Sequence, residues 1–415
     1  MNQSAATPVA DLPDTAPRSP RAPRAVQMAL RLMERLDRGA LELVLPDGSH
    51  RRFGDGQGPR AALHLHDWHL CGAALKSGDI GFAESFIDGH WSTPDLPALL
   101  RLMIANREQV ESVIYGSWWG ALLYRLRHLL NRNTRTGSRK NIHAHYDLGN
   151  EFYRLWLDPS MNYSGAWFNG NRAQPLEQAQ HAKMRRALAA AGVQQGARIL
   201  EIGCGWGALA ETAARDLQAR VTGVTLSTEQ LAWASARMRT AGLSERVDLR
   251  LQDYRDITDE PFDAVVSVEM FEAVGREYWP SFFATLKRCL KPGAQACIQS
   301  ITIRDDLFDR YVRSTDFIQQ YIFPGGLLPS QAEFCRAAER AGLEVVDRMA
   351  FGTDYAETLR RWRTAFAAQA ERVLPLGFDE RFMRIWDFYL AYCEAAFDTG
   401  NTDLLQFTLR RPHDE

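Results

Sequence analysis

The sequence predicts an α/β fold: a Rossmann-like, doubly wound parallel sheet with a small N-terminal domain and helical insertions. Three observations support this. Between residues 198 and 268, short apolar strands alternate with helical segments at the spacing typical of a parallel sheet. The first strand runs directly into a glycine-rich turn that opens a helix. Polar and acidic residues follow the strands, at the ends where such sheets bind ligands.

The N-terminal part of the chain is predicted to be a tail followed by a small domain. Residues 1–24 are rich in Pro, Ala, Ser and Arg and lack an apolar signal core, which predicts a disordered tail. Residues 25–110 contain a strand signal at 41–45 before a Pro-Asp-Gly turn, and helical patterns at 81–88 and 96–106. No catalytic residues stand out in this domain.

A basic amphipathic linker helix is predicted over residues 111–140. The stretch 112–146 contains no Asp or Glu, while it carries Trp118 and Trp119. Two interpretations are equally supported. The helix lies at a membrane interface and contacts anionic lipid, or it packs between domains with its basic face in solvent. The basic residues are Arg125, Arg127, Arg132, Arg135, Arg139 and Lys140.

The glycine-rich turn after the strand at 198–202 predicts a site for a nucleoside-containing cofactor. Its glycines let a ligand approach bare backbone N–H groups at a helix N-terminus. A dinucleotide site would have an acidic residue at the end of the next strand, but Thr225 stands there. Glu201 ends the first strand instead, and its carboxylate suits an amino group or a ribose hydroxyl. The pattern therefore favours S-adenosylmethionine over NAD.

The next two strands add candidate contacts to that site. Ser227 is a candidate N-cap for the helix after the strand at 220–224, and Gln230 is placed to reach an adenosine, although a plain capped helix explains this segment equally well. The strand at 247–251 is followed by Asp253, whose carboxylate suits an adenine amino group.

A series of motifs gives these features a family context. Over roughly residues 141–410, the chain closely resembles the cyclopropane fatty acyl phospholipid synthase and mycolic acid cyclopropane synthase family. The resemblance implies a class I methyltransferase domain that moves a methyl group from S-adenosylmethionine to a cis double bond of an acyl chain. A proton is then lost and a ring closes. The motifs lie at 143–153, 157–168, 201–207, 225–230, 270–272 and 321–326.

The resemblance also implies which residues contact the cofactor. They come from the motif before the first strand, the glycine turn, and the segments after the second and third strands. The implied contacts are Tyr163, Ser164, Glu201, Gly203, Gly205, Trp206, Gly207, Thr225, Ser227, Gln230, Asp253 and Tyr254.

The family's base is a bicarbonate ion held by a Cys, a Glu, a His, an Ile backbone and a Tyr. Here Glu272, Ile301 and Tyr355 match the Glu, Ile and Tyr. Gly165 stands where the family has Cys, and Gln299 stands where it has His. Gln299 donates a hydrogen bond but carries no charge, and Gly165 offers only backbone. We therefore expect a looser, less cationic anion cage.

The chemistry of alkene methylation limits which products can form with Gly165 and Gln299 in the site. Methylating a double bond creates a cation that must lose a proton to a base in a dry pocket. We expect the product to be a cyclopropane acyl chain. The alternative is a methyl-branched, methylenated or furan-precursor chain. A non-catalytic lipid-binding protein is a third interpretation, against which the intact Glu201, Glu272 and Tyr355 argue.

Cys393 matches a family cysteine proposed as a nucleophile. It lies on an apolar helical stretch at 388–397, where cysteine usually serves as core. Direct methyl transfer to an alkene needs no covalent enzyme intermediate. We therefore name Cys393 as a candidate but expect a structural role.

Composition sets the remaining bounds. The formal net charge of −2 gives no general attraction to nucleic acid, and the six cysteines show no metal-binding spacing, as in reduced cytosolic proteins. No stretch reaches the roughly 18 apolar residues of a membrane span. We expect a cytoplasmic protein, peripheral to the inner face of the membrane, that acts on unsaturated acyl chains of phospholipid. No metal is expected, and a homodimer is left open.

Overall fold

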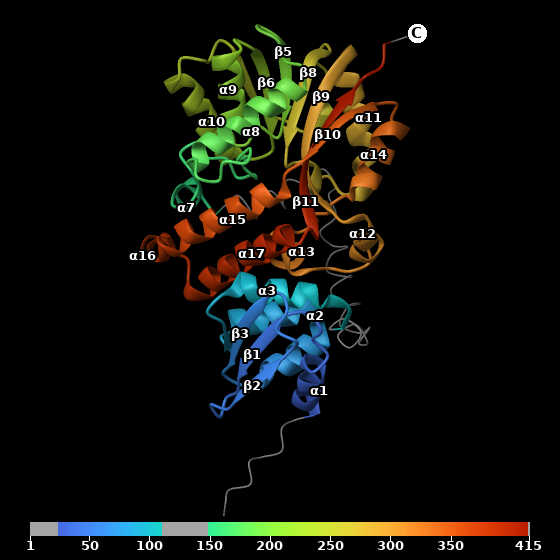
Figure 1. Ribbon diagram of the computed structural model, residues 1–415. Helices are drawn as coiled ribbons and strands as arrows, with labels where there is room; N and C mark the ends of the chain where they lie inside the picture. The colour runs from blue at the N-terminus through green and yellow to red at the C-terminus, as the bar shows by residue number, and fades with distance from the viewer. Residues whose placement is uncertain (1–23, 110–147, 414–415) are drawn as a thin grey trace, which may run out of the picture.

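The computed structural model describes residues 24–109 and 148–413. These residues form a four-stranded sheet domain and a seven-stranded sheet flanked by helices (Figure 1). The predicted linker helix at 111–140 and nearly all of the predicted tail lie outside the described residues. Among the residues described, no helix is long and apolar enough to span a bilayer.

The N-terminal domain is built on the strand order β2-β1-β3-β4, with β1 parallel to β3 and antiparallel to β2. Leu41 and Leu43 of β1 are buried while Glu42 between them is exposed, which is the alternation of a half-buried strand. The predicted strand at 41–45 is thus confirmed. The elements are α1 (Arg24–Met33), β1 (Ala40–Val44), β2 (His50–Phe53), β3 (Arg60–Leu65), α2 (His69–Ile87), β4 (Trp91–Ser92) and α3 (Leu96–Ala105).

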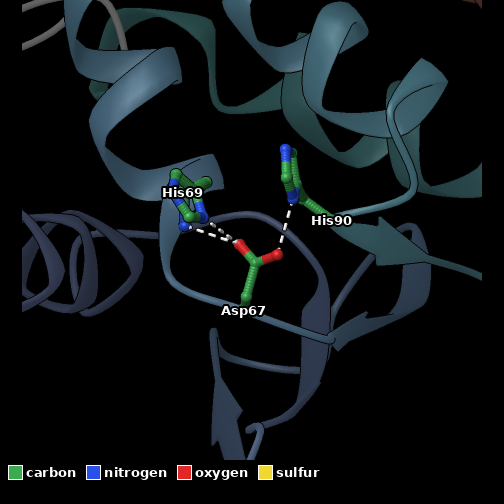
Figure 2. Close-up of side chains that lie close together, drawn as sticks. All are labelled: Asp67, His69 and His90. Atoms are coloured by element: carbon green, nitrogen blue, oxygen red, sulfur yellow. Dashed lines mark hydrogen bonds and ion pairs between the residues drawn. The ribbon is translucent and has the colours of Figure 1, made fainter.

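One carboxylate joins two loops of this domain. Figure 2 shows Asp67 between His69 and His90, with Oδ1 3.0 Å from Nδ1 of His69 and Oδ2 2.5 Å from Nδ1 of His90. The backbone N–H of His66 donates to the His90 carbonyl oxygen at 2.9 Å. The three side chains offer ligand atoms within 4.8 Å of one another, as a metal site would. Since Asp67 already accepts from both imidazoles, we assign them to loop structure.

The large sheet has the order β10-β11-β9-β8-β5-β6-β7. Strands β5 to β9 are mutually parallel, and β11 inserts antiparallel between β9 and β10. This confirms the predicted α/β fold, with one antiparallel strand that was not expected. The strands are β5 (Arg198–Ile202), β6 (Arg220–Thr225), β7 (Val247–Leu251), β8 (Phe262–Val268), β9 (Leu290–Ile303), β10 (Glu344–Ala350) and β11 (Thr402–Arg410).

Helices cover both faces of this sheet. Ile199 of β5 packs in the core formed with α8 (Leu176–Ala190), α9 (Ala208–Asp216) and α10 (Thr228–Thr240). The next residue, Leu200, packs in the opposite core, formed with α11 (Trp279–Cys289) and α14 (Gln331–Arg340). Successive residues of a buried strand thus serve opposite faces, and Figure 1 shows the two helical layers on either side.

The helical insertions connect the two domains. Helices α15 and α17 lie between the large sheet and the N-terminal domain (Figure 1). Arg101 of α3 forms an ion pair with Asp398 of α17 at 2.7 Å, and the hydroxyl of Tyr321 donates to Glu84 of α2 at 2.5 Å. The insertions are α7 (Asn150–Arg154), α12 (Asp305–Tyr311), α13 (Phe317–Tyr321), α15 (Gly352–Ala367), α16 (Ala370–Val373) and α17 (Glu380–Asp398), with 3₁₀ turns η1 (Tyr254–Asp256), η2 (Phe271–Ala273), η3 (Arg276–Tyr278) and η4 (Leu374–Leu376).

Candidate functional site

A cavity of about 170 Å³ lies at the carboxyl ends of β5, β6, β7 and β8. Two of the predicted cofactor contacts do not line it. The Ser227 hydroxyl accepts from the Gln230 N–H at 3.2 Å and caps α10, and Gly207, with φ of 84°, precedes α9. The predicted residues that do line it are Tyr163, Ser164, Glu201, Gly203, Gly205, Trp206, Thr225, Gln230, Asp253 and Tyr254.

The glycine turn exposes bare backbone to this cavity. Gly203 and Gly205 have φ of 85° and 51°, which favours glycine. A Cβ at Gly203 would lie 3.0 Å from Met270, whereas a Cβ at Gly205 would meet nothing within 4 Å. The open side at Gly205 and the adjacent N-terminus of α9 leave room for a polar ligand beside the backbone.

Glu201 is one of several charged residues that line the cofactor cavity. Its side chain is buried, and this burial raises its pKa to about 8 against the opposing effect of the Lys183 ammonium. Its Oε2 has no hydrogen-bond partner among the described residues. A buried carboxylate oxygen without a partner is costly, so it suits a ligand that brings a cationic donor. The amino group of S-adenosylmethionine is such a donor.

Two other predicted contacts already have partners within the chain. Gln230 Oε1 accepts from the Thr225 hydroxyl at 3.1 Å, which leaves its amide NH₂ for a ligand. Asp253 accepts from Arg255 at both oxygens, at 2.8 and 2.6 Å. Each carboxylate oxygen has a second lone pair, so the contact with an adenine amino group stays a prediction.

Lys183 is a buried cation that sequence reasoning missed. It comes from α8, is completely buried and donates to the Ser164 hydroxyl at 2.5 Å. Burial lowers its pKa to about 8, while Glu269, Asp158 and Glu201 raise it. The ammonium thus compensates charge on several carboxylates around the cofactor cavity. From the sequence alone, a buried lysine on a helix rich in polar residues cannot be distinguished from a lysine that faces solvent.

A second, larger cavity of about 430 Å³ adjoins the first. Its lining is mainly apolar and comes from the N-terminal domain as well as from α12, α13, α15 and α17. Tyr163, Glu269 and Ala273 line both cavities. An acyl chain in the large cavity and a cofactor in the small one would therefore meet at Tyr163 and Glu269. The predicted residues Glu272, Ile301, Tyr355 and Cys393 also line the large cavity.

Glu269 occupies the centre of the expected anion cage. Its Oε1 accepts from the Gly165 N–H and from the Gln299 amide, each at 2.8 Å, and its Oε2 accepts from the Tyr355 hydroxyl at 2.8 Å. It has a φ of 49°, a strained value for a residue with a side chain. Burial raises its pKa, opposed mainly by Lys183.

The two departures from the family pattern fit this carboxylate. A Cβ at Gly165 would lie 2.4 Å from Leu404 Cδ2 and 2.8 Å from Tyr355 Cγ, so a cysteine there would force these side chains to shift. Gln299 is completely buried, and its Oε1 accepts from Gln406 at 2.9 Å while its NH₂ reaches Glu269. We expected a looser anion cage, but the carboxylate of Glu269 occupies it and accepts the hydrogen bonds of its donors.

Glu272 lies beside this group as a second partly buried carboxylate. Its Oε1 accepts from the Ile301 N–H at 2.5 Å and from the Ser300 hydroxyl at 3.2 Å. Burial and then the charge of Glu269 raise its pKa to about 8. Its Oε2 has no hydrogen-bond partner among the described residues. Because two close carboxylates resist ionising together, Glu272 favours its protonated form when Glu269 is charged.

Restoring the family's cysteine by Gly165→Cys is expected to destabilise the protein by about 1–3 kcal/mol, because the added atoms overpack the contact with Leu404 and Tyr355. Denaturant unfolding measures the loss. Gly72→Cys is the matched control, since its Cβ would enter open space. An unchanged unfolding midpoint for Gly165→Cys would contradict this packing.

Cys393→Ser is expected to retain roughly half or more of the activity, because the thiol is not a nucleophile at neutral pH. Burial raises the pKa of Cys393, so the unreactive thiol form persists. The measurement is kcat for methyl transfer alongside the melting temperature. A fall of more than about tenfold in a variant that melts normally would restore the catalytic role.

Comparisons with known proteins identify the family of this chain. The family model "Mycolic acid cyclopropane synthetase" matches residues 133–407. The tuberculostearic acid methyltransferase UfaA1 of Mycobacterium tuberculosis is 40% identical over 95% of this chain and 93% of the relative. The cyclopropane-fatty-acyl-phospholipid synthase of Escherichia coli K12 is 34% identical over 81% of this chain and 84% of the relative.

The solved structures include the mycolic acid cyclopropane synthase CmaA1 complexed with SAH and CTAB. It aligns with a TM-score of 0.62 and 32% identity, and covers 66% of this chain and 98% of its own. The fold, the two adjoining cavities and these matches lead to one assignment. The chain belongs to the mycolic acid cyclopropane synthetase family and is an S-adenosylmethionine-dependent methyltransferase of the cyclopropane-fatty-acyl-phospholipid synthase type.

Proposed function

We propose that the protein methylates the cis double bond of an unsaturated phospholipid acyl chain at the membrane surface, and that Glu269 is its base. S-adenosylmethionine supplies the methyl group when bound. The single observation that carries the proposal is the position of Glu269, which lines both cavities and accepts three hydrogen bonds within the chain. Glu201 and Gln230 would hold the cofactor, and the apolar cavity would hold the acyl chain.

Bicarbonate does not fit this site. The donors that would hold it, from Gly165, Gln299 and Tyr355, are bonded to Glu269. A further anion there would face both Glu269 and Glu272 at close range, which disfavours its charged form. We therefore derive no step through bicarbonate and assign the proton to Glu269.

The proton balance allows two products. Addition of a methyl group to one alkene carbon leaves the cation on the other carbon. If a hydride shifts from the methylated carbon to the cationic one, the cation moves to the methylated carbon. Glu269 then takes a proton from the new methyl group, and the freed electron pair forms an exocyclic double bond. Without that shift, the same electron pair closes a cyclopropane ring.

We favour the methylenated chain over the cyclopropane. A relative that matches nearly the whole chain is named "Tuberculostearic acid methyltransferase UfaA1", a methyltransferase and not a cyclopropane synthase. Cyclopropanation is the second candidate, supported by the Escherichia coli relative. The surroundings of Glu269 do not by themselves select between the two, because both products lose the proton from the same methyl group.

The test is product analysis. The purified protein is incubated with S-adenosylmethionine and vesicles of dioleoyl phosphatidylglycerol in bicarbonate-free buffer, and the released acyl chains are analysed by mass spectrometry and proton NMR. Both products add one CH₂, so the NMR signals of vinylidene or cyclopropane protons decide between them. Cyclopropane signals would reject methylenation, and a requirement for added bicarbonate would reject Glu269 as the base.

A further inference from the structure

The apolar cavity carries charged side chains away from the reaction centre. Asp79 of α2, Arg107 just after α3, Arg310 of α12 and Asp316 just before α13 all line it. None of these residues lines the cofactor cavity. Charged groups are rarely placed in an apolar cavity without use, because their desolvation is costly. The cavity is therefore amphipathic, as a substrate with a polar head and an apolar tail requires.

The two arginines line the same cavity and are near enough to interact electrostatically. Burial, and after it the neighbouring guanidinium of Arg107, lower the pKa of Arg310. Arg107 also lies close enough to the exposed Asp306 to lower the pKa of that carboxyl, although Arg304 does so more strongly. Both arginine side chains are partly exposed, which places them at the rim of the cavity. A phosphate bound at this rim would be attracted by both guanidinium groups.

The two carboxylates hold the elements around the cavity together. Asp79 accepts from the backbone N–H groups of Ile80 and Phe317, and the Tyr392 hydroxyl lies 3.4 Å from its Oδ2. Asp316 caps α13 through the Gln319 N–H at 2.8 Å. They fix the start of α13 against the N-terminal domain. Asp79 also attracts Arg310, which helps to hold that guanidinium toward the cavity.

We propose that Arg107 and Arg310 bind the phosphate at the head of the acyl substrate. This inference rests on the proposed function, because it takes the apolar cavity as the acyl site. Guanidinium groups suit the purpose, since they recognise phosphate oxygens in bidentate geometry. The N-terminal domain would then contribute to substrate recognition through Arg107, while the catalytic part contributes Arg310. Two sources share this chemistry: a glycerophospholipid and an acyl thioester of phosphopantetheine.

The test compares two ligands that differ only in the phosphate, oleoyl lysophosphatidic acid and monooleoylglycerol. Binding is measured by calorimetry on the full chain without cofactor. Arg107→Gln and Arg310→Gln are each expected to weaken binding of the phosphate-bearing ligand by about tenfold and to leave monooleoylglycerol unchanged. Arg313→Gln is the matched control, because Arg313 is exposed just after α12 and does not line the cavity.

The outcomes separate this inference from the proposed function. Equal weakening of both ligands, or no change for either, would overturn phosphate recognition. Oleoyl coenzyme A and dioleoyl phosphatidylglycerol, tested in parallel, identify which source binds more tightly through the arginines. If the phosphate-dependent pattern holds but the unmodified protein methylates neither lipid, the arginine site stands and the proposed reaction fails.

Discussion

Replacing Glu269 by glutamine is expected to lower kcat for methyl transfer by about 10²- to 10⁴-fold, the usual contribution of a general base. Glutamine keeps the size of the side chain and one oxygen acceptor. Glutamine cannot take the proton, and it has no negative charge to stabilise the carbocation formed on the acyl chain. The remaining oxygen would still accept from Gly165 and Gln299, and the new NH₂ would donate to the Tyr355 hydroxyl, so the fold and cofactor affinity should persist. Single-turnover kinetics with vesicles and labelled cofactor measure the effect.

A cavity variant sharpens this test. Glu269→Gly removes the carboxylate and frees its three donors, so added bicarbonate or acetate is expected to restore part of the lost rate. The unmodified enzyme should not respond to either anion. Glu277→Gln, an exposed carboxylate nearby, serves as the control and should retain full activity. Near-normal turnover by Glu269→Gln would disprove the base assignment.

The second large effect concerns cofactor affinity and pH. Burial raises the pKa of Glu201 to about 8 in the free protein, and the ionised carboxylate is the form that binds a cationic amino group. Below that pKa the carboxyl is protonated, so affinity for S-adenosylmethionine should rise from pH 6 to about pH 8. It should fall again at higher pH, where the α-amino group of the ligand loses its own proton. Glu201→Gln should weaken binding at about pH 8 by about 10- to 100-fold, as expected for a lost charged hydrogen bond.

Calorimetry at a series of pH values checks this expectation. Because burial also lowers the pKa of Lys183 to about 8, two groups titrate in the same range. The Glu201→Gln variant separates them, since any dependence that survives in it belongs to Lys183 or to the ligand. A pH-independent affinity in the unmodified protein would contradict a role for Glu201 ionisation.

Much of the fold could be predicted because its signals are local. The strand at 247–251 has the predicted bounds, the other predicted strands of the large sheet differ from β5, β6 and β8 by at most one residue, and α9 begins at Ala208 as expected. Each is a short apolar run between turn residues. The antiparallel β11 was not anticipated, because its position between β9 and β10 depends on pairing across more than 50 residues of chain.

The candidate site could be predicted only in part, for a reason visible at Glu269. The family resemblance points to Glu272 and assigns no role to Glu269, the acidic residue that precedes it in the sequence. Its role depends on a positive φ that turns the carboxylate toward Gly165, Gln299 and Tyr355, which come from distant parts of the chain. A signal was available: two anion ligands were missing, and an extra carboxylate stood nearby. Lys183 gave no such signal.

The lining of the large cavity has a consequence for how such enzymes diversify. Ala74, Phe82, Leu100 and Met103 of the N-terminal domain form part of its wall, whereas the matched family region begins only at residue 133. Part of the wall of the large cavity is thus encoded outside the matched family region, while the rest lies within it. Substitutions in the N-terminal part of the wall are therefore expected to change which chains are accepted while leaving Glu269 and its donors in place. A library of chimeras that exchanges only this wall would be a direct route to altered substrate range.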